Sequence, residues 1–347
     1  MSGGQACARR DCAAPFAGDA VTAPAIWVVS DGRAGIERQA LSLARAVHDR
    51  SPGPLATLRL APRGLQVSLP PDMWPTPLAA LPADQRASLR APWPDVWIGS
   101  GRRSIPYSRQ VKRWSAGRTL VVQTQDPRVN LAPFDLVVPP AHDCVAPAHN
   151  VFPILGPPTW WSAGDIAAAQ SAFPALARDA RRKLLVSIGG DSKTHKLTVA
   201  AAARIEAALR AAANDHALWI SVSRRTPEPA RARLRALAAD LGAIFWETPD
   251  RDGPNPYLAW LSLCDAALVT EDSANLLADP AFFAKPIHLL RLEGRSDRFD
   301  RLHADFIDRG AARWFDGRIE AWTYAPIREA ERAAAEILRL LAGRRPA

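Results

Sequence analysis

Short runs of apolar and β-branched residues alternate along this chain with amphipathic helical stretches, and a turn rich in glycine or polar residues separates each run from the helix that follows. This alternation is typical of parallel β-strands connected by helices that cover both faces of the sheet. In the first half, helices are expected at 36–48 and 105–115. The strands of that half are expected at 25–30, 55–60, 96–99, 119–123, 134–138 and 151–155.

The same pattern restarts after a stretch at 157–161 that is rich in proline and tryptophan and indicates a hinge. Strands are then expected at 183–188, 218–222, 243–246, 266–270 and 286–290, and helices at 196–213, 227–240, 256–263, 273–284 and 325–342. We therefore predict the α/β class, with two Rossmann-like doubly wound domains that face a central cleft. The predicted divisions are a flexible tail at 1–23, an N-terminal domain at 24–160, a C-terminal domain at 161–325 and a C-terminal helix at 326–347.

The composition narrows the possible functions. A formal net charge of +9 suggests polyanionic partners. The arginines of the chain, however, are dispersed over alanine-rich helices, and the sequence has no helix-turn-helix, zinc-finger or RRM signature. We therefore do not expect a nucleic-acid partner. The four cysteines lack the paired spacing of a metal site, so we expect no metal.

The chain has no apolar run of roughly 20 residues and no apolar core of a signal peptide near its start, so a cytoplasmic protein is expected. The segment 61–94 shows no clean period and contains Trp74 and Trp93. Together with the basic excess, these tryptophans predict peripheral binding to an anionic membrane surface, such as the inner face of a bacterial membrane. The alternative is that both tryptophans pack inside the domain.

The first strand is followed by a loop that is expected to carry function, because doubly wound sheets bind ligands at the carboxyl ends of their strands. Its sequence is Asp31-Gly32-Arg33-Ala34-Gly35. Gly32 and Gly35 permit a tight turn and the close approach of a second group. Asp31 and Arg33 would then point into the cleft on the acceptor side. The alternative is that Asp31 only caps the following helix.

A second loop opens the C-terminal half with Gly189 and Gly190, and Ser192 is available to cap the helix that is expected from 196. Lys193 adds positive charge at the same end, where lysine does not favour the helix itself. This placement favours the binding of a phosphate group at the helix N-terminus over simple capping.

Two further loops follow strands of the C-terminal half. Arg224 and Arg225 come directly after the strand at 218–222, and arginines in that place can grip a diphosphate. In so arginine-rich a chain, we assign this role to Arg224 alone.

The turn at 271–273 precedes another predicted helix. There, Asp272 or Ser273 could cap the helix while its N–H groups bind phosphate oxygens. Asp279 could reach a ribose hydroxyl at the edge of the cleft, or it could be an ordinary exposed acid on the helix.

Taken together, these loops resemble the bacterial members of the mitochondrial fission family named for elongated mitochondria, which are also described as glycosyltransferases. The matching segments are SDGRAGIERQALSLA, WIGSGRRSIP, QDPRVNLAPFDLVVPPAHD, SIGGDSKTHKL, SVSRRTP and VTEDSANLLADPAFFAKPIHLL. They occur in this order from about residue 26 to residue 290. The last segment is similar to the nucleotide-sugar-binding segment of GT-B glycosyltransferases, although those enzymes usually carry Glu in place of Asp279 and a small residue in place of Phe283.

The resemblance implies a GT-B fold whose C-terminal domain holds a nucleotide-diphosphate sugar and whose N-terminal domain holds an acceptor. The expected reaction is transfer of the sugar to an acceptor such as a cell-envelope glycan. Helix N-termini and cationic side chains, rather than a metal or a cofactor, would stabilise the departing diphosphate. Either Asp31 or Asp126 of the QDPR segment could take the acceptor's proton, and the sequence does not separate them. Two alternatives stay open, namely an inactive adaptor on the same scaffold and a nucleotide-sugar epimerase.

Overall fold

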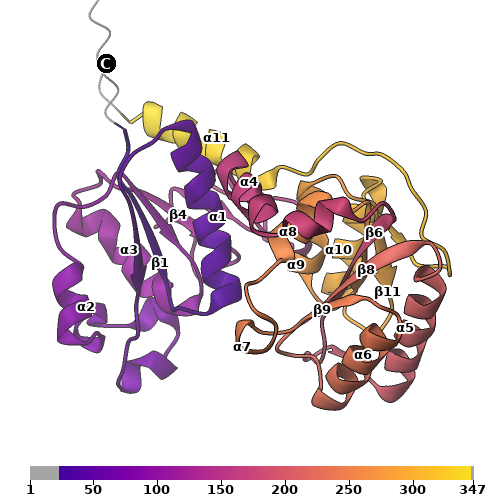
Figure 1. The fold of residues 1–347 in the computed structure, drawn as a ribbon. Coiled ribbons are helices and arrows are strands. Elements are labelled where there is room, and N and C mark those ends of the chain that lie inside the picture. Colours follow the sequence, from indigo (N-terminus) through magenta and orange to yellow (C-terminus); the bar gives the residue numbers. More distant parts are fainter. Residues whose placement is uncertain (1–22, 345–347) are drawn as a thin grey trace, which may run out of the picture.

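The computed structural model describes residues 23–344, so residues 1–22 of the predicted tail lie outside the described part. Two parallel sheets lie side by side, each covered by helices (Figure 1). The strands of the first sheet, in spatial order, are β2 (Leu55–Arg59), β1 (Ile26–Ser30), β3 (Val96–Gly99), β4 (Leu120–Thr124) and β5 (Leu136–Val138). This order reverses direction between β1 and β3, so a ligand is expected outside the carboxyl ends of those two strands.

Helices cover both faces of the first sheet. On one face, α1 (Ala34–Arg50) packs on buried side chains of the sheet. The other face is covered by α3 (Ile105–Trp114) and by the excursion at 61–94. Short helices make up this excursion and the neighbouring loops: η1 (Leu65–Ser68), η2 (Pro71–Met73), η3 (Pro77–Ala80), α2 (Ala83–Ser88), η4 (Arg102–Ser104) and η5 (Ala141–Asp143).

The tryptophans of the excursion pack inside the domain. Trp74 is only 6% exposed and lies edge-on against Tyr107, with 6.3 Å between ring centroids. Trp93 is half-buried and stacks on Trp114 at 5.4 Å. The expectation of a membrane-facing side chain is therefore wrong for Trp74, which is buried, and the packing of Trp93 on Trp114 does not support it for Trp93.

The strand predicted at 151–155 is not formed. Two isolated bridges remain, between Val137 and Val151 and between Pro140 and Ile154. Pro153 lies between them and has no N–H group to extend a ladder, which explains why the pairing is interrupted.

The second sheet contains six parallel strands: β13 (Ala312–Trp314), β11 (Ile287–Leu290), β10 (Ala266–Thr270), β6 (Arg182–Ile188), β8 (His216–Val222) and β9 (Ile244–Trp246). Counted along the chain from β6, the spatial order read from β9 is 3-2-1-4-5-6, which is the order of dinucleotide-binding sheets. The order reverses between β6 and β10. Both sheets therefore confirm the predicted α/β class with two Rossmann-like units.

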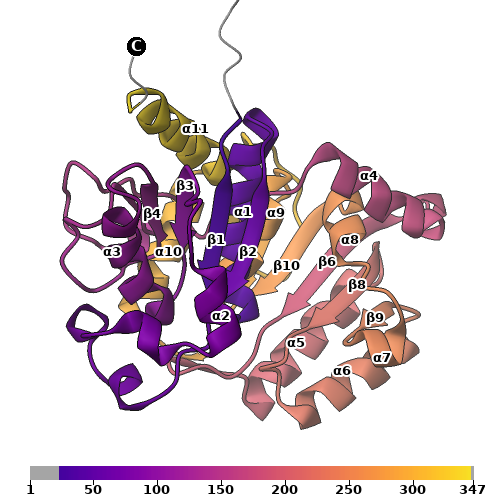
Figure 2. The ribbon, with the colours of Figure 1, turned by 90° about the vertical axis from the view of Figure 1, so that its left-hand side faces the viewer.

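Helices also cover both faces of the second sheet. Along one face lie α5 (Val199–Ala212) and α6 (Glu228–Asp240) (Figure 2). The opposite face is covered by α8 (Tyr257–Leu263), α9 (Ala274–Phe282) and α10 (Asp297–Asp308). Three further elements are α4 (Ala163–Ala172), η6 (Pro174–Arg178) and α7 (Pro249–Asp252). Helix α10 was not expected, although Phe299, Leu302 and Phe306 follow a helical spacing.

The helix predicted from residue 196 begins later than expected. Residues His195–Lys196 form a short strand, β7, which pairs with β12 (Glu293–Gly294). Helix α5 then starts after Thr198, whose side chain accepts a hydrogen bond from the Ala201 N–H. Thr198, and not Ser192, is therefore the capping residue.

The C-terminal helix α11 (Glu329–Ala342) returns to the first sheet and lies along α1 (Figure 1). Ala330, Ala333, Ala334 and Ile337 are fully buried in the same core as α1 and strands β1 to β5. The chain therefore crosses between the two units twice, before α4 and again before α11. Within residues 23–344, no helix has the length and apolar character required to cross a lipid bilayer.

Candidate functional site

Two cavities open at the carboxyl ends of the strands. The first, which we call the interdomain cavity, has a volume of about 500 Å³ and contains side chains from both units. It lies where β6, β8 and β9 end, and α1 and α9 form its other walls. Four residues singled out from the sequence line it: Gly35, Arg224, Ser273 and Asp279.

Two helices begin at this interdomain cavity. Gly35 belongs to the first turn of α1, and Ser273 and Asn275 belong to the start of α9. A Cβ atom placed on Gly35 would lie 3.9 Å from Asn275 Nδ2, so the two helix starts face each other closely. The first-turn N–H groups of a helix have no acceptor within it. The Ile36 and Leu276 N–H groups donate to the carbonyls of Arg33 and Ser273. Since the Ser273 side chain makes no capping bond, the remaining N–H groups at the two helix starts, together with both helix dipoles, favour an anion at this cavity.

Arg38 of α1 pairs with Asp279 of α9 across the seam between the two units. The Asp279 side chain is only 2% exposed, so it is not an exposed helical acid. Burial raises the pKa of Asp279, and the Arg38 guanidinium opposes this shift. The Arg38 guanidinium also lies over the Trp161 ring, 5.3 Å from its centroid. Whether Asp279 contacts a ribose stays a prediction.

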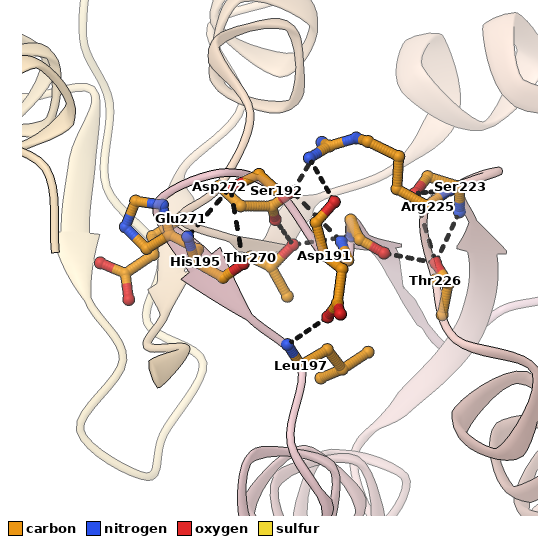
Figure 3. Close-up of polar contacts among 12 residues, drawn as sticks. Asp191, Ser192, His195, Leu197, Ser223, Arg225, Thr226, Thr270, Glu271 and Asp272 are labelled. Atoms are coloured by element: carbon orange, nitrogen blue, oxygen red, sulfur yellow. Dashed lines mark hydrogen bonds and ion pairs between the residues drawn. The ribbon is translucent and has the colours of Figure 1, made fainter. Parts of the chain in front are cut away.

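Asp272 is buried, does not line the interdomain cavity, and has its carboxylate held by contacts within the protein (Figure 3). Its carboxylate accepts hydrogen bonds from the Gly190 N–H at 3.1 Å, the Thr270 hydroxyl at 2.7 Å and Arg225 at 2.6 Å. A Cβ atom on Gly189 would lie 2.1 Å from Asp272 Oδ1. Gly189 therefore allows the Asp272 carboxylate to approach the loop, and Gly190 allows the backbone carbonyl of Arg225 to do so, which is a packing reason for both glycines.

The neighbouring arginines Arg224 and Arg225 differ in their contacts. Arg225 is bound to the buried carboxylate of Asp272. Arg224 is exposed, lines the interdomain cavity and has no carboxylate within 4 Å among residues 23–344. Only Arg224 therefore has its full charge available to a ligand.

Ser192 and Lys193 lie in the turn before β7 and line neither cavity. The Ser192 hydroxyl accepts hydrogen bonds from the N–H groups of Thr194 at 3.2 Å and His195 at 2.9 Å, as part of a local turn. Since no helix starts there, the reason for expecting a phosphate at these residues is absent.

The second cavity, which we call the loop cavity, has a volume of about 470 Å³ and lies at the β1/β3 reversal of the first sheet. Asp126 lines it. Asp31 does not: its carboxylate accepts two hydrogen bonds from the Arg33 guanidinium, at 2.9 and 2.6 Å, and its side chain is 2% exposed. Gly32 adopts a φ of +78°, and its N–H donates to Ser30 Oγ at 3.1 Å, so this loop is a tight turn.

The first turn of α1 separates the two cavities, because Gly35 lines the interdomain cavity and Ile36 lines the loop cavity. Sequence analysis missed the roles of Arg38, Tyr257 and Arg298. Arg38 follows Gly35 by three residues, so helical spacing could have placed it at the same cavity. Arg298 could have been found only by recognising α10.

Two buried hydroxyl groups on the wall of the interdomain cavity interact with each other but make no hydrogen bond of regular geometry in the described part of the chain. These are Ser187 Oγ, at the end of β6, and Tyr257 Oη, at the start of α8. Buried polar atoms of this kind are rare in folded proteins, and a bound ligand is one common partner for them.

Comparison with known proteins gives consistent findings. The family model described as Mitochondrial fission ELM1 matches residues 34–341. The Arabidopsis thaliana mitochondrial fission protein ELM1 is 25% identical over 282 residues, which cover 72% of this chain but only 65% of that protein. An uncharacterized Rickettsia prowazekii protein, RP120, is 24% identical over 89% of this chain and 96% of its own length.

Among solved structures, the UDP-GlcNAc 2-epimerase of Methanocaldococcus jannaschii is similar in fold. Its TM-score is 0.50 at 12% sequence identity, and the match covers 92% of this chain and 99% of the epimerase. This likeness concerns the arrangement of two Rossmann-like units.

Proposed function

This chain belongs to the mitochondrial fission ELM1 family, and we propose that it transfers a sugar from a nucleoside diphosphate sugar to an acceptor. The observation that carries this proposal is the pair of adjoining cavities, which share the first turn of α1 as a wall. A transferase must hold a donor and an acceptor side by side, whereas an epimerase needs one site only.

The interdomain cavity is the proposed donor site. The starts of α1 and α9 and the unpaired Arg224 would stabilise the negative charge that develops on the leaving diphosphate. The hydroxyls of Ser187 and Tyr257, which line this cavity, would hydrogen-bond the nucleoside. The chemistry of these groups requires no metal ion, since helix N-termini and a guanidinium supply the positive charge.

The loop cavity is the proposed acceptor site, with Asp126 as the general base. Asp126 lines this cavity, while Asp31 is bound to Arg33 and largely buried. The base must lie within hydrogen-bond reach of the acceptor hydroxyl, so Asp126 is favoured over Asp31. An acceptor from the cell envelope remains the proposed substrate class.

A thermal-shift measurement tests the donor site. UDP or GDP at roughly a hundred times its dissociation constant should add about 2.7 kcal/mol to the free energy of unfolding. The shift should survive addition of a chelator. A shift that the chelator abolishes contradicts the metal-independent mechanism, and absence of any shift favours the adaptor alternative.

Product analysis then separates the two enzymatic possibilities. With UDP-N-acetylglucosamine as the only substrate, an epimerase would change the configuration of the sugar, whereas a transferase would release UDP only when an acceptor is supplied. Epimerised sugar nucleotide in the absence of acceptor would contradict the proposed transfer.

A further inference from the structure

We propose that the loop cavity binds an oxyanion, a phosphate or carboxylate group, on the molecule that occupies it. This site is distinct from the interdomain cavity, and only the identification of the bound molecule as the acceptor rests on the proposed function. The acceptor would then be a sugar or sugar derivative that carries a negative charge near the hydroxyl that reacts.

Three arginines line the loop cavity: Arg102, Arg128 and Arg298. Within the described residues, neither Arg102 nor Arg128 has a carboxylate within 4 Å, and Arg102 donates only to the Leu69 carbonyl at 3.2 Å. Two acids, Asp126 and Asp143, lie at the same cavity. The cavity therefore keeps an excess of positive charge that no residue within 23–344 neutralises.

Of the two acids, Asp143 is paired with Arg298, so these two charges offset each other. Asp126 Oδ1 accepts a hydrogen bond from the Arg128 N–H at 2.8 Å, which fixes the carboxylate on the same loop as the guanidinium. A ligand would thus meet one acid beside two unpaired guanidinium groups. An anion with a neighbouring hydroxyl matches this arrangement, because guanidinium binds oxyanions through two parallel hydrogen bonds.

The backbone of this loop is held in an unfavourable conformation. Gln125 and Arg128 have φ values of +66° and +54°, in the left-handed region that non-glycine residues seldom occupy. These two residues flank Asp126 and Pro127, all four of which line the cavity. Such strain persists where the surroundings enforce it and is frequent at binding sites. It holds Arg128 and Asp126 in fixed positions on one wall.

The cavity also needs both halves of the chain. Arg298 lies on α10 of the second unit, whereas Arg102 and Arg128 belong to the first. An oxyanion that touches Arg128 and Arg298 would join the two units at the place where the acceptor binds. Occupation of the site is therefore expected to favour the arrangement in which the two cavities adjoin.

Isothermal titration of the full-length protein tests the inference. The protein is first saturated with UDP, which occupies the interdomain cavity, and is then titrated with glucose 1-phosphate, glucuronate or glucose. Binding of glucose 1-phosphate or glucuronate, without binding of glucose, is expected, and the stronger of the two identifies phosphate or carboxylate as the preferred group. Equal binding of glucose, or no binding of either anion, overturns the inference.

Variants then locate the site. Arg128→Ala and Arg102→Ala should each weaken anion binding by about ten- to a hundredfold, the loss expected for one charge-assisted contact. Arg103→Ala is the matched control, because Arg103 is exposed beside Arg102 but does not line the cavity. An equal loss in Arg103→Ala, or unchanged binding in the other two variants, contradicts the assignment.

The design separates this inference from the proposed function. If UDP does not bind, the donor site fails, and the anions are then titrated into Arg224→Ala protein, whose interdomain cavity lacks its free guanidinium. Binding that remains there and is lost with Arg128→Ala supports an oxyanion site in the loop cavity even though the transfer proposal has failed.

Discussion

Arg38 and Asp279 are separated by 241 positions in the chain, yet their side chains form an ion pair between α1 of the first unit and α9 of the second. The carboxylate is almost completely removed from solvent. The pair therefore fastens the two units together beside the interdomain cavity and fixes the distance between the two helix starts that face it.

Replacing Arg38 by alanine should lower the free energy of unfolding by about 3 kcal/mol at pH 7, because a buried carboxylate is left without its partner. The double variant Arg38→Ala/Asp279→Asn should recover part of this loss, since the neutral amide is less costly to bury. Urea unfolding of the two variants and the parent measures the difference. A double variant no more stable than Arg38→Ala would mean that the ion pair is not the cause.

The same pair predicts a dependence on pH. Burial raises the pKa of Asp279 above its ordinary value. A carboxyl whose folded-state pKa is raised stabilises the fold below its unfolded pKa of about 3.9, and this contribution is lost as pH rises through the folded-state pKa. Arg38 lowers this pKa, so without Arg38 the carboxyl of Asp279 takes up its proton at a still higher pH. The difference in the free energy of unfolding between the parent and Arg38→Ala should therefore shrink as pH falls from 7 towards 5. A gap that widens on acidification contradicts this account.

Arg224→Ala and Arg225→Ala should affect different properties, although the residues are adjacent: the first should weaken UDP binding and the second should lower stability. Loss of Arg224 should weaken UDP binding by about 1.5–3 kcal/mol and leave the unfolding temperature unchanged. Loss of Arg225 should destabilise the fold by about 1–3 kcal/mol, because Asp272 loses one of its three partners. Titration calorimetry measures UDP binding by both variants, and thermal unfolding measures their stability. If both variants lose the same amount of affinity and of stability, the two arginines do not have the separate roles assigned here.

Asp126→Asn should reduce sugar transfer by about 10²–10⁴-fold and leave UDP binding intact, as expected for loss of a general base outside the donor site. Asp31→Asn is the comparison. It removes an ion pair with Arg33 in a tight turn, so its main effect should be on the local loop and not on the chemical step. Transfer rates at saturating donor decide between the two residues. A larger loss of rate in Asp31→Asn would identify Asp31 as the general base.

Gly190→Ala should destabilise the protein by roughly 1–3 kcal/mol or more, because the added Cβ atom would lie 2.2 Å from the Arg225 carbonyl oxygen. Gly164→Ala is the control: its nearest neighbour would be Ser162 Oγ at 3.7 Å, and the site lies within helix α4. This change should be neutral or stabilising. Chemical denaturation measures both, and a well-tolerated Gly190→Ala would contradict the close approach.

Sequence periodicity predicted every strand of the first sheet and all strands of the second except β13, because each buried strand is a short apolar run followed by a turn. It also predicted a strand at 151–155 that is not formed, and it missed α10. The features that periodicity did not predict depend on contacts between residues far apart in the sequence. The chain at 195–196 becomes a strand since β12 lies beside it, and that partner is about a hundred residues away. Asp272 looks like a phosphate-facing residue from its place in the loop, but Arg225 and Gly190 surround it.

Arg38 shows the same limitation at the candidate site. Helical spacing places it one turn after Gly35, but its importance depends on Asp279 in the other unit. Arg298 likewise reaches the loop cavity only because α10 packs near η5. Sequence spacing predicted which loops lie near the cavities, whereas the contacts that turn Asp31 and Asp272 away from a ligand, and those that join residues across the seam, depend on tertiary structure.

The return of α11 to the first unit has a consequence for the order of events during translation. Helix α11 covers an apolar surface of α1 with four buried side chains: Ala330, Ala333, Ala334 and Ile337. While the ribosome is still synthesising the second sheet, the surface of α1 that α11 packs against stays exposed, although strands β1 to β5 have already been synthesised. The N-terminal unit is therefore synthesised first but completed last, and a nascent chain halted before residue 329 leaves the surface of α1 that α11 covers exposed to water.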